Sequence, residues 1–418
     1  MRPDGTHYEL SGLYDDQLII ASRLIEKIKE FMTMRDLSKF VPLRCTIVGE
    51  GGTGKSVLIS TITSVVWRMF ERTDVIRVAA PTGVAACNIG GETLHRLTAS
   101  RPNRKEGEYK ANSMQPTQND RLSKKFKVLM GIIVDERSML SSVLLGETAQ
   151  KVGETIYEGG HTRREPIGDV PFFCPVGDDY QLPPTINQGA ICSYKTDKGK
   201  MTQKGRDIFQ TCSEEVYILH QNKRLSDDRT QDRDILGRVR VGENILDEDV
   251  TKIKSLHIDE IEKAHGKAIT DEIKAKSVYI FWTNEKRIRH NLERLAQTNT
   301  EENPTAFITT KSSGGKYGKG VNSHFESDLP KTALLCETAL AAIDGCNFCP
   351  LWGVHNGACG RVVEIVFKPG NSPNNGNQPE YVVLDLPLYS GPAWDLDNPT
   401  VSKIIDPRQY MFSDHNLT

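Results

Sequence analysis

The chain has 418 residues, a formal net charge of -2 and an apolar fraction of 38%. This length predicts two domains with buried cores, and the near-neutral charge excludes attraction of nucleic acid through an overall basic field. A nucleic acid would therefore be held in a local groove. No apolar stretch approaches the roughly 20 residues that span a bilayer, and the N-terminus has no apolar leader segment. With nine scattered cysteines, we expect an intracellular protein with reduced thiols and no membrane partner.

The first 214 residues alternate predicted helices and strands, and we expect them to form one domain. Apolar residues recur at helical spacing over residues 17–32 and again over 57–69. Apolar strands are expected at residues 44–48, 75–80, 131–134 and 172–176. Such alternation predicts the α/β class, with a parallel sheet covered on both faces. The polar stretch at about 99–125 is predicted to be an inserted loop.

The alternation resumes with strands expected at residues 215–219 and 277–281. We therefore expect a second domain over residues 215–418, with a parallel sheet of its own. The segment 369–380 is rich in Asn, Pro and Gly and is predicted to be a loop.

A glycine-rich segment, Gly49-Glu50-Gly51-Gly52-Thr53-Gly54-Lys55-Ser56, matches the phosphate-loop pattern without a mismatch. In such a loop the backbone N–H groups converge on a phosphate at a helix N-terminus. Lys55 is predicted to reach the β- and γ-phosphates, and Ser56 to offer its hydroxyl to Mg²⁺. A chance glycine-rich turn is the alternative, which the flanking strand and helix disfavour. The segment predicts a nucleoside triphosphate site made by Gly49, Gly51, Gly52, Thr53, Gly54, Lys55 and Ser56.

Two carboxylates, Asp135 and Glu136, follow the apolar strand at 131–134. Ligands of open α/β sheets bind at the carboxyl ends of the strands. Asp135 is therefore predicted to hold Mg²⁺, directly or through water, and Glu136 to activate the attacking water. A solvated acidic turn is the alternative. Because the phosphate loop lies in the same domain, the pair favours ATP hydrolysis.

Three longer segments resemble motifs of the Pif-type branch of superfamily 1 DNA helicases. They are Ala80–His95, Val134–Leu140 and Gly177–Pro184. The resemblance extends over about residues 13–367. It implies two tandem RecA-like domains, ATP and Mg²⁺ as cofactors, and single-stranded, forked or structured DNA as partner. It also implies 5′→3′ movement with unwinding, a monomer, roles in DNA repair, recombination and telomere maintenance, and a nuclear or mitochondrial location in a eukaryote.

The resemblance also implies roles for single residues near the nucleotide. Gln17 resembles the glutamine that reads adenine, with a surface glutamine on an amphipathic helix as the alternative. Gln181 resembles the residue that senses the γ-phosphate, with Asp178 as its local partner. Arg224 resembles the second-domain arginine that reaches the γ-phosphate. Four more arginines follow it, and arginines in such a run are more often part of a solvated helix face: Arg229, Arg233, Arg238 and Arg240.

The resemblance places DNA contacts in both predicted domains. The residues concerned are Pro81, Thr82, Gly83, His95, Thr283, Asn356 and Gly357. Phe281 and Trp282 precede three basic residues, a combination typical of a strand-binding groove, with core packing at a strand end as the alternative. Asn356-Gly357 is also a common hairpin turn, and the two interpretations are compatible.

Two further features test the resemblance. Cys346 and Cys349, followed by His355 and Cys359, have a spacing that zinc would fit, although the resemblance does not require it. Nothing after Val366 matches the last helicase motif of the family. We therefore expect a truncated chain with an incomplete second sheet, or an ATP-gated single-stranded DNA-binding ATPase that does not unwind. A P-loop enzyme of another kind, such as a small-molecule kinase, is disfavoured by Gln181 and Arg224.

Overall fold

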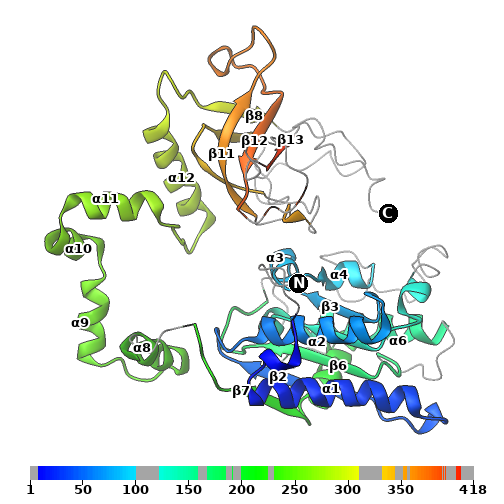
Figure 1. Cartoon of the computed structure of the whole chain (residues 1–418). Helices are drawn as coiled ribbons and strands as arrows, with labels where there is room; N and C mark the ends of the chain where they lie inside the picture. The colour runs from blue at the N-terminus through cyan, green and yellow to red at the C-terminus, as the bar shows by residue number, and fades with distance from the viewer. Residues whose placement is uncertain are drawn as a thin grey trace. The chain divides into compact units, whose positions relative to one another are not determined.

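The computed structural model describes residues 8–99, 122–158, 167–184, 191, 199–224, 230–309, 332–343, 352–354, 358–387, 389, 391 and 402–405. The chain forms two compact units, Met1–Leu246 and Asp247–Thr418 (Figure 1). Of the predicted inserted loop at 99–125, residues 100–121 lie outside the described residues. None of the helices in the described part combines the length and the apolar character that a membrane crossing needs.

A parallel sheet of seven strands forms the centre of the first unit, in the order β4-β3-β5-β6-β2-β7, with β1 beside β6. The strands are β1 (Leu43–Arg44), β2 (Thr46–Gly49), β3 (Ile76–Ala80), β4 (Glu92–Thr93), β5 (Gly131–Val134), β6 (Phe172–Gly177) and β7 (Val216–Leu219). The helices are α1 (Asp15–Thr33), α2 (Lys55–Phe70), α3 (Gly83–Asn88), α4 (Leu94–Leu97), α6 (Ser142–Glu158), α7 (Lys200–Cys212) and α8 (Thr230–Val241), with a 3-10 turn η3 (Arg137–Met139). The predicted α/β class is confirmed.

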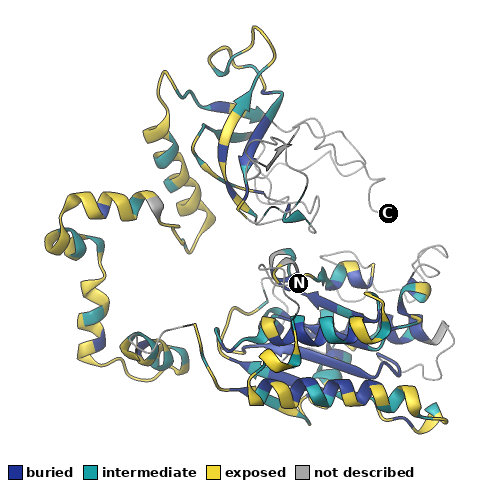
Figure 2. Cartoon of the chain, viewed as in Figure 1, coloured by how far each residue is buried: buried dark blue, intermediate teal, exposed yellow. Residues whose placement is uncertain are grey.

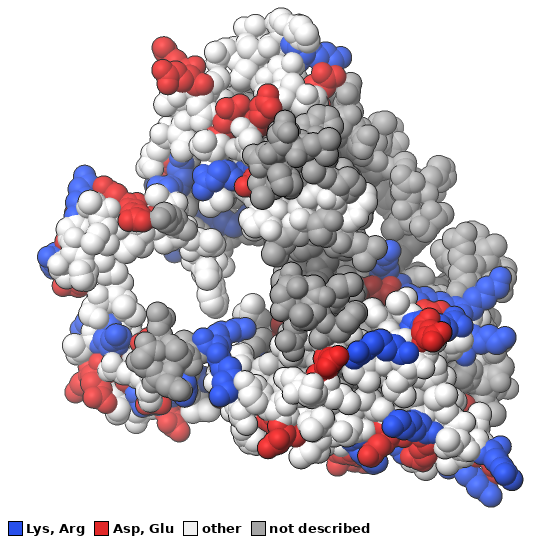
Figure 3. Space-filling view, in the orientation of Figure 1, with Lys and Arg blue, Asp and Glu red and all other residues white. Residues whose placement is uncertain are grey.

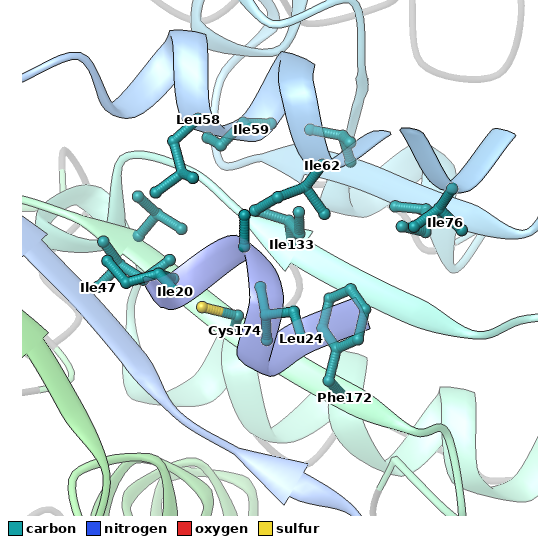
Figure 4. Packing of buried hydrophobic residues seen from close by; sticks show 14 of the residues in the cluster. Ile20, Leu24, Ile47, Leu58, Ile59, Ile62, Ile76, Ile133, Phe172 and Cys174 are labelled. Atoms are coloured by element: carbon teal, nitrogen blue, oxygen red, sulfur yellow. The ribbon is translucent and has the colours of Figure 1, made fainter. Parts of the chain in front are cut away.

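Apolar side chains cover both faces of this sheet. On β5, Ile133 packs into one cluster with α1 and α2, whereas its neighbours Ile132 and Val134 pack into the other with α6. Successive side chains of a strand point to opposite faces, so a continuous apolar run serves both layers. Figure 4 shows the first cluster, in which Leu58 and Ile62 of α2 lie over the strands.

The first unit extends beyond the predicted boundary at residue 214. β7 pairs in parallel with β2, so that Thr46 lies opposite Val216 and Gly49 opposite Leu219. The strand predicted at 215–219 therefore completes the first sheet instead of opening a second one. The units divide after Leu246.

The second unit is built from four helices and two small antiparallel sheets in its described part. Its helices are α9 (Asp247–Ser255), α10 (Ile258–His265), α11 (Lys267–Lys276) and α12 (Asn284–Thr298). Strands β8 (Ala306–Thr309) and β9 (Thr332–Leu335) form one sheet. The other joins β10 (Leu340–Ala342), β11 (Cys359–Val366), β12 (Tyr381–Asp385) and β13 (Ser402–Ile405).

The parallel sheet predicted for the second domain is not found among the described residues. Residues 277–281, predicted as a strand, adopt no regular structure, and Ile280 is 95% exposed. An apolar run becomes a buried strand only when neighbouring strands and a covering layer are supplied from elsewhere in the chain. The prediction of a loop at 369–380 is confirmed, apart from a short 3-10 turn at Pro373–Asn375.

Burial and charge agree with this division. Buried residues concentrate in the sheet of the first unit, while α9 to α12 are mostly exposed (Figure 2). On the face drawn in Figure 3, Lys and Arg side chains are interspersed with Asp and Glu. This agrees with the net charge of -2.

Candidate nucleotide site

The phosphate loop, Gly49–Ser56, joins β2 to α2 as predicted. Gly52 and Gly54 adopt positive φ angles of 98° and 78°, which L side chains rarely accept. A Cβ at Gly54 would also lie 2.5 Å from Nε2 of Gln17. Thr53 closes the turn by donating its N–H and hydroxyl to the Glu50 carbonyl, at 3.3 and 2.9 Å. The loop therefore has the strand–loop–helix geometry that holds a phosphate at a helix N-terminus.

Lys55 is the cation at the centre of this loop. Its Nζ donates to the carbonyl oxygens of Gly49 and Glu50, each at 2.8 Å. Burial lowers the pKa of Lys55, while the charges of Asp178, Asp135 and Glu136 raise it and that of Arg224 lowers it further. Three carboxylates and an arginine from separate segments thus act on one ammonium group.

Asp135 and Glu136 follow β5 at the carboxyl end of the sheet. The N–H of Asp135 continues the ladder to β3 by donating to Ala79 O at 2.8 Å, and its side chain is buried. Burial raises the pKa of Asp135 to about 6, even though Lys55 acts in the opposite direction. Glu136 has φ 54° and ψ 50°, a left-handed conformation that costs a non-glycine residue about 1–3 kcal/mol and is found at functional sites.

Asp178 and Gln181 lie on the segment that follows β6. Asp178 accepts the Tyr180 N–H at 3.1 Å and the Gln181 side-chain amide at 3.4 Å. A Cβ at Gly51 would lie 4.0 Å from Gln181 Nε2, which places the amide beside the phosphate loop. Burial tends to raise the pKa of Asp178, but the hydrogen bonds from Arg240 and from the Tyr180 N–H, together with the charges of Arg240 and Lys55, lower it.

The segment that follows β7 packs directly onto the phosphate loop. The Asn222 side-chain amide donates to Gly51 O at 2.9 Å, and Lys223 N donates to Gly52 O at 3.0 Å. A Cβ at Gly51 would meet Arg224 Nη1 at 3.2 Å, so the guanidinium lies at the loop. Arg224 belongs to the first unit, not to a second domain as expected, because its strand β7 pairs in the first sheet.

Gln17 is buried against the same loop from α1. Its Nε2 donates to Thr53 O at 3.1 Å, and its Oε1 accepts the Tyr14 N–H at 3.2 Å. The sequence alternative of a surface glutamine is therefore wrong. Its role toward adenine stays a prediction.

The residues predicted to contact DNA fall in three places. Pro81, Thr82 and Gly83 are half-buried at the start of α3, where the Thr82 hydroxyl accepts the Ala85 N–H at 3.3 Å. His95 lies on α4, and burial lowers the pKa of its imidazole. Thr283, in the second unit, caps α12 by accepting the Lys286 N–H. Asn356 and Gly357 lie outside the described residues.

The carboxylate of Asp135 and the hydroxyl of Ser56, which are predicted to hold Mg²⁺, have the right chemistry. Ser56 lies in the first turn of α2 at the phosphate loop, and carboxylate, hydroxyl and phosphate oxygens are the ligands Mg²⁺ prefers. Asp135 has a raised pKa that a divalent cation would lower. No cluster of three or more His, Cys, Asp or Glu suited to a metal occurs in the described part of the chain. The zinc candidates Cys346, Cys349 and His355 lie outside it, and Cys359 is exposed.

Three contacts at the site were not predicted from the sequence. Besides Asn222, Arg137 is buried and makes a bidentate pair with Asp179, at 2.8 and 2.6 Å. Arg240, predicted as part of a solvated helix face, makes a bidentate pair with Asp178. The only signal in the sequence is the Gly177-Asp178-Asp179 stretch, in which Asp178 is buried and needs a positive partner.

Comparison with known proteins agrees with this geometry. Residues 39–240 match the family model of the PIF1-like helicases. The chain is 29% identical to the ATP-dependent DNA helicase RRM3 of Saccharomyces cerevisiae over 226 residues, which cover 53% of this chain and 28% of that protein. It is 30% identical to the ATP-dependent DNA helicase PIF1 of the same species over 223 residues, covering 50% and 22%. The chain therefore spans about a quarter of the length of these relatives.

The fold is also similar to a solved structure. The Pif1 helicase of Candida albicans superposes with a TM-score of 0.56 at 18% identity, over 90% of this chain and 75% of that one. At this identity the likeness concerns the fold alone. It agrees with the RecA-like architecture expected of the first unit.

Proposed function

We propose that this chain, which matches the family model of the PIF1-like helicases over residues 39–240, is an ATPase that moves 5′→3′ along single-stranded DNA and unwinds duplex at forks. The relatives are named as ATP-dependent DNA helicases. The proposal includes Mg²⁺ as cofactor, action as a monomer, and an intracellular site of action, nuclear or mitochondrial in a eukaryote. Roles in repair, recombination and telomere maintenance are part of the same proposal.

One observation carries the ATPase part of this proposal. Residues from four strand ends converge on the phosphate loop: Lys55 after β2, Asp135 and Glu136 after β5, Asp178 after β6 and Arg224 after β7. In an open parallel sheet the carboxyl ends of the strands form the ligand site. A cation, acids and a permanently charged guanidinium around one phosphate loop are the groups that phosphoryl transfer to water requires.

Each residue of this set has a proposed part in hydrolysis. Lys55 would bind the β- and γ-phosphate oxygens, and Glu136 would accept a proton from the attacking water. Arg224 would stabilise charge on the phosphoryl group, since a guanidinium stays protonated and offers several donors. Ser56 and Asp135 would hold Mg²⁺, which neutralises phosphate charge when bound. Gln181 would sense the γ-phosphate.

DNA contacts are proposed for both units. Pro81, Thr82 and Gly83 lie at the start of α3, where N–H groups and a hydroxyl suit phosphates without reading sequence. His95 has a lowered pKa, so at neutral pH it would act as a hydrogen-bonding group and not as a cation. In the second unit Thr283, Asn356 and Gly357 remain candidates from the sequence.

The test is the ATPase rate with and without single-stranded DNA. We expect DNA to stimulate hydrolysis in the wild-type protein. Glu136→Gln should lower kcat by about 10²–10⁴-fold, the usual contribution of a general base. Arg224→Ala should lower it by about 10³-fold or more. Arg72→Ala is the matched control, because Arg72 makes an exposed bidentate pair with Asp74 away from the site.

A second candidate function is an ATP-gated single-stranded DNA-binding ATPase that does not unwind. It is favoured by the second unit, whose described strands pair antiparallel and whose segment 277–281 joins no sheet. Forked duplexes with a 5′ or a 3′ single-stranded tail separate the two. Unwinding of the 5′-tailed fork alone supports the motor, while DNA-stimulated hydrolysis without strand separation supports the gated binder. Hydrolysis that is indifferent to DNA contradicts both.

A further inference from the structure

Arg240, near the end of α8, contacts three residues around the nucleotide site: Asp178, Glu50 and Tyr180. Its Nη1 and Nη2 donate to the two carboxylate oxygens of Asp178, both at 2.5 Å. Its Nε lies 3.5 Å from Glu50 of the phosphate loop, and its guanidinium stacks over the Tyr180 ring at 4.6 Å. One side chain therefore contacts both the phosphate loop and the segment that carries Gln181.

The contact is important because Asp178, the partner of Arg240, is buried. The Asp178 side chain is only 1% exposed, while that of Arg240 is 21% exposed. A buried carboxylate that loses its arginine keeps its desolvation cost without compensation, so the pair is far more sensitive to change than an exposed ion pair. Asp178 also accepts the Gln181 amide and acts on Lys55. A change at Arg240 is thus transmitted to both.

The apolar packing of α8 is sparse. Ile235 is its buried apolar residue, whereas Leu236, Val239 and Val241 are all more than half exposed. A helix with one buried apolar side chain has weak packing. The bidentate bond to Asp178 therefore adds a polar contact that helps to hold α8 in the first unit. The helix follows the segment that carries Arg224, with residues 225–229 between them.

We propose that Arg240 is a positioning residue for ATP hydrolysis, which acts through Asp178 to hold Gln181 at the phosphate loop and α8 against the site. This inference rests on the proposed ATPase function. Arg240 touches neither Lys55 nor Glu136 in the contacts described above; it reaches the site by its bidentate bond to Asp178 and, at 3.5 Å, by its pair with Glu50. It adds to the site a residue that the sequence pattern assigned to a solvated helix face.

The test compares kcat and KM for ATP in the full chain. Arg240→Ala should lower DNA-stimulated kcat by about 100-fold, the loss expected when a catalytic group moves by about 1 Å. KM for ATP and affinity for a fluorescent ADP analogue should change by no more than about threefold, because the phosphate loop itself remains. Arg240→Lys keeps one charged donor and should recover a large part of kcat. Arg72→Ala, which breaks an exposed bidentate pair, should leave both parameters unchanged.

A double-mutant cycle separates action through Asp178 from direct action on the nucleotide. Asp178→Asn keeps the size of the side chain and removes the charge that Arg240 binds. If Arg240 acts through Asp178, adding Arg240→Ala to Asp178→Asn should cost little more than either change alone. Independent, multiplying losses would overturn the inference. A wild-type rate for Arg240→Ala would do the same.

Two further outcomes concern a variant that does not fold and a wild-type chain without ATPase activity. Far-UV circular dichroism shows whether Arg240→Ala folds. If it does not, Arg240→Lys replaces it, and a lysine variant that folds and gives an additive cycle with Asp178→Asn contradicts the inference. If the wild-type chain has no ATPase activity, the proposed function fails and not the positioning role alone. If Arg240→Ala leaves the wild-type ATPase rate unchanged, only the positioning role is contradicted.

Discussion

The two units of the chain bury their apolar side chains to very different extents. In the first unit, α1 and α2 pack on one face of the parallel sheet and α6 on the other, with Leu58 and Ile62 fully buried. In the second unit, α12 has no buried residue, and Ile288 on this helix is 48% exposed. Its core is a small cluster on the antiparallel sheet β10–β13. Since burial contributes about 25 cal/mol per Å² of apolar surface, the stability of the chain is concentrated in the first unit.

The difference in burial also bears on how accurately the groups around the phosphate loop are held. The groups around the phosphate loop leave the ends of β2, β5, β6 and β7, which pair side by side in a buried sheet. A site built on regular, well-packed elements holds its groups more accurately than one built on loops. The first unit can therefore hold charged groups in place although they repel one another or lose hydration. The comparison predicts that substitutions and ligands affect the two units unequally.

The largest difference should come from matched isoleucines on helices. Ile62→Ala in α2 removes a fully buried side chain and should lower the free energy of unfolding by about 2–5 kcal/mol. Ile288→Ala in α12 should change it by no more than about 0.5 kcal/mol. Urea unfolding followed by circular dichroism measures both. Similar losses for the two variants would mean that α12 is packed in solution and would remove the contrast between the units.

Asp135 allows a second comparison of the two units, because the free-energy cost of its ionisation arises from burial in the first unit. Its pKa of about 6 lies above the ordinary 3.8, so the folded protein binds the extra proton and stability falls as pH rises between these values. The ionised form then costs about 3 kcal/mol at pH 7. Asp135→Asn should recover up to this amount at pH 7 and little at pH 4.

The control for Asp135 is an exposed carboxylate of the second unit. Asp259, on α10, has an exposed side chain, and Asp259→Asn should leave the free energy of unfolding nearly unchanged at both pH values. Both variants are measured without nucleotide or Mg²⁺. A stabilisation of Asp135→Asn that is equal at pH 4 and pH 7 would show that ionisation of this carboxyl is not the cause.

Nucleotide binding should stabilise one unit selectively. A non-hydrolysable ATP analogue with Mg²⁺, at 100 times its Kd, should add about 2.7 kcal/mol to the stability of the unit that binds it. Hydrogen exchange should then slow in peptides from β2 and α2, while those from β11 and β12 keep their rates. Lys55→Ala should abolish the protection. Equal protection of both sheets would show that the units respond to nucleotide together.

Local patterns in the sequence predicted much of the first unit. The glycines at 49, 51, 52 and 54 specify the phosphate loop, because backbone conformation there depends on the absence of a Cβ. Continuous apolar runs predicted β3, β5 and β6, since strands buried on both faces need no alternation. The carboxylates Asp135 and Glu136 followed from their place at a strand end. Each of these inferences depends on neighbouring residues only.

Pairings between distant segments could not be predicted in this way. The strand at 215–219 was recognised, but nothing in its own residues tells that it pairs with β2. The run at 277–281 looks like a strand and joins no sheet among the described residues. Arg240 and its partner Asp178 are 62 residues apart, so the sequence gives no sign which of several arginines is bound. Register and ion pairing are set by tertiary structure.

The smallest test lies inside the second unit and concerns two adjacent valines of β11. Val362 is 1% exposed and belongs to the core cluster, whereas Val363 is 42% exposed at the point where the register with β12 shifts. Val→Ala removes the same two methyl groups at both positions and lowers strand propensity alike, so the difference reports burial. Val362→Ala should cost about 1.6 kcal/mol, and Val363→Ala less than about 0.5 kcal/mol. Reversed costs would mean that the strand has slipped by one residue, because such a slip exchanges its buried and exposed faces. Equal costs would contradict the difference in burial between the two valines.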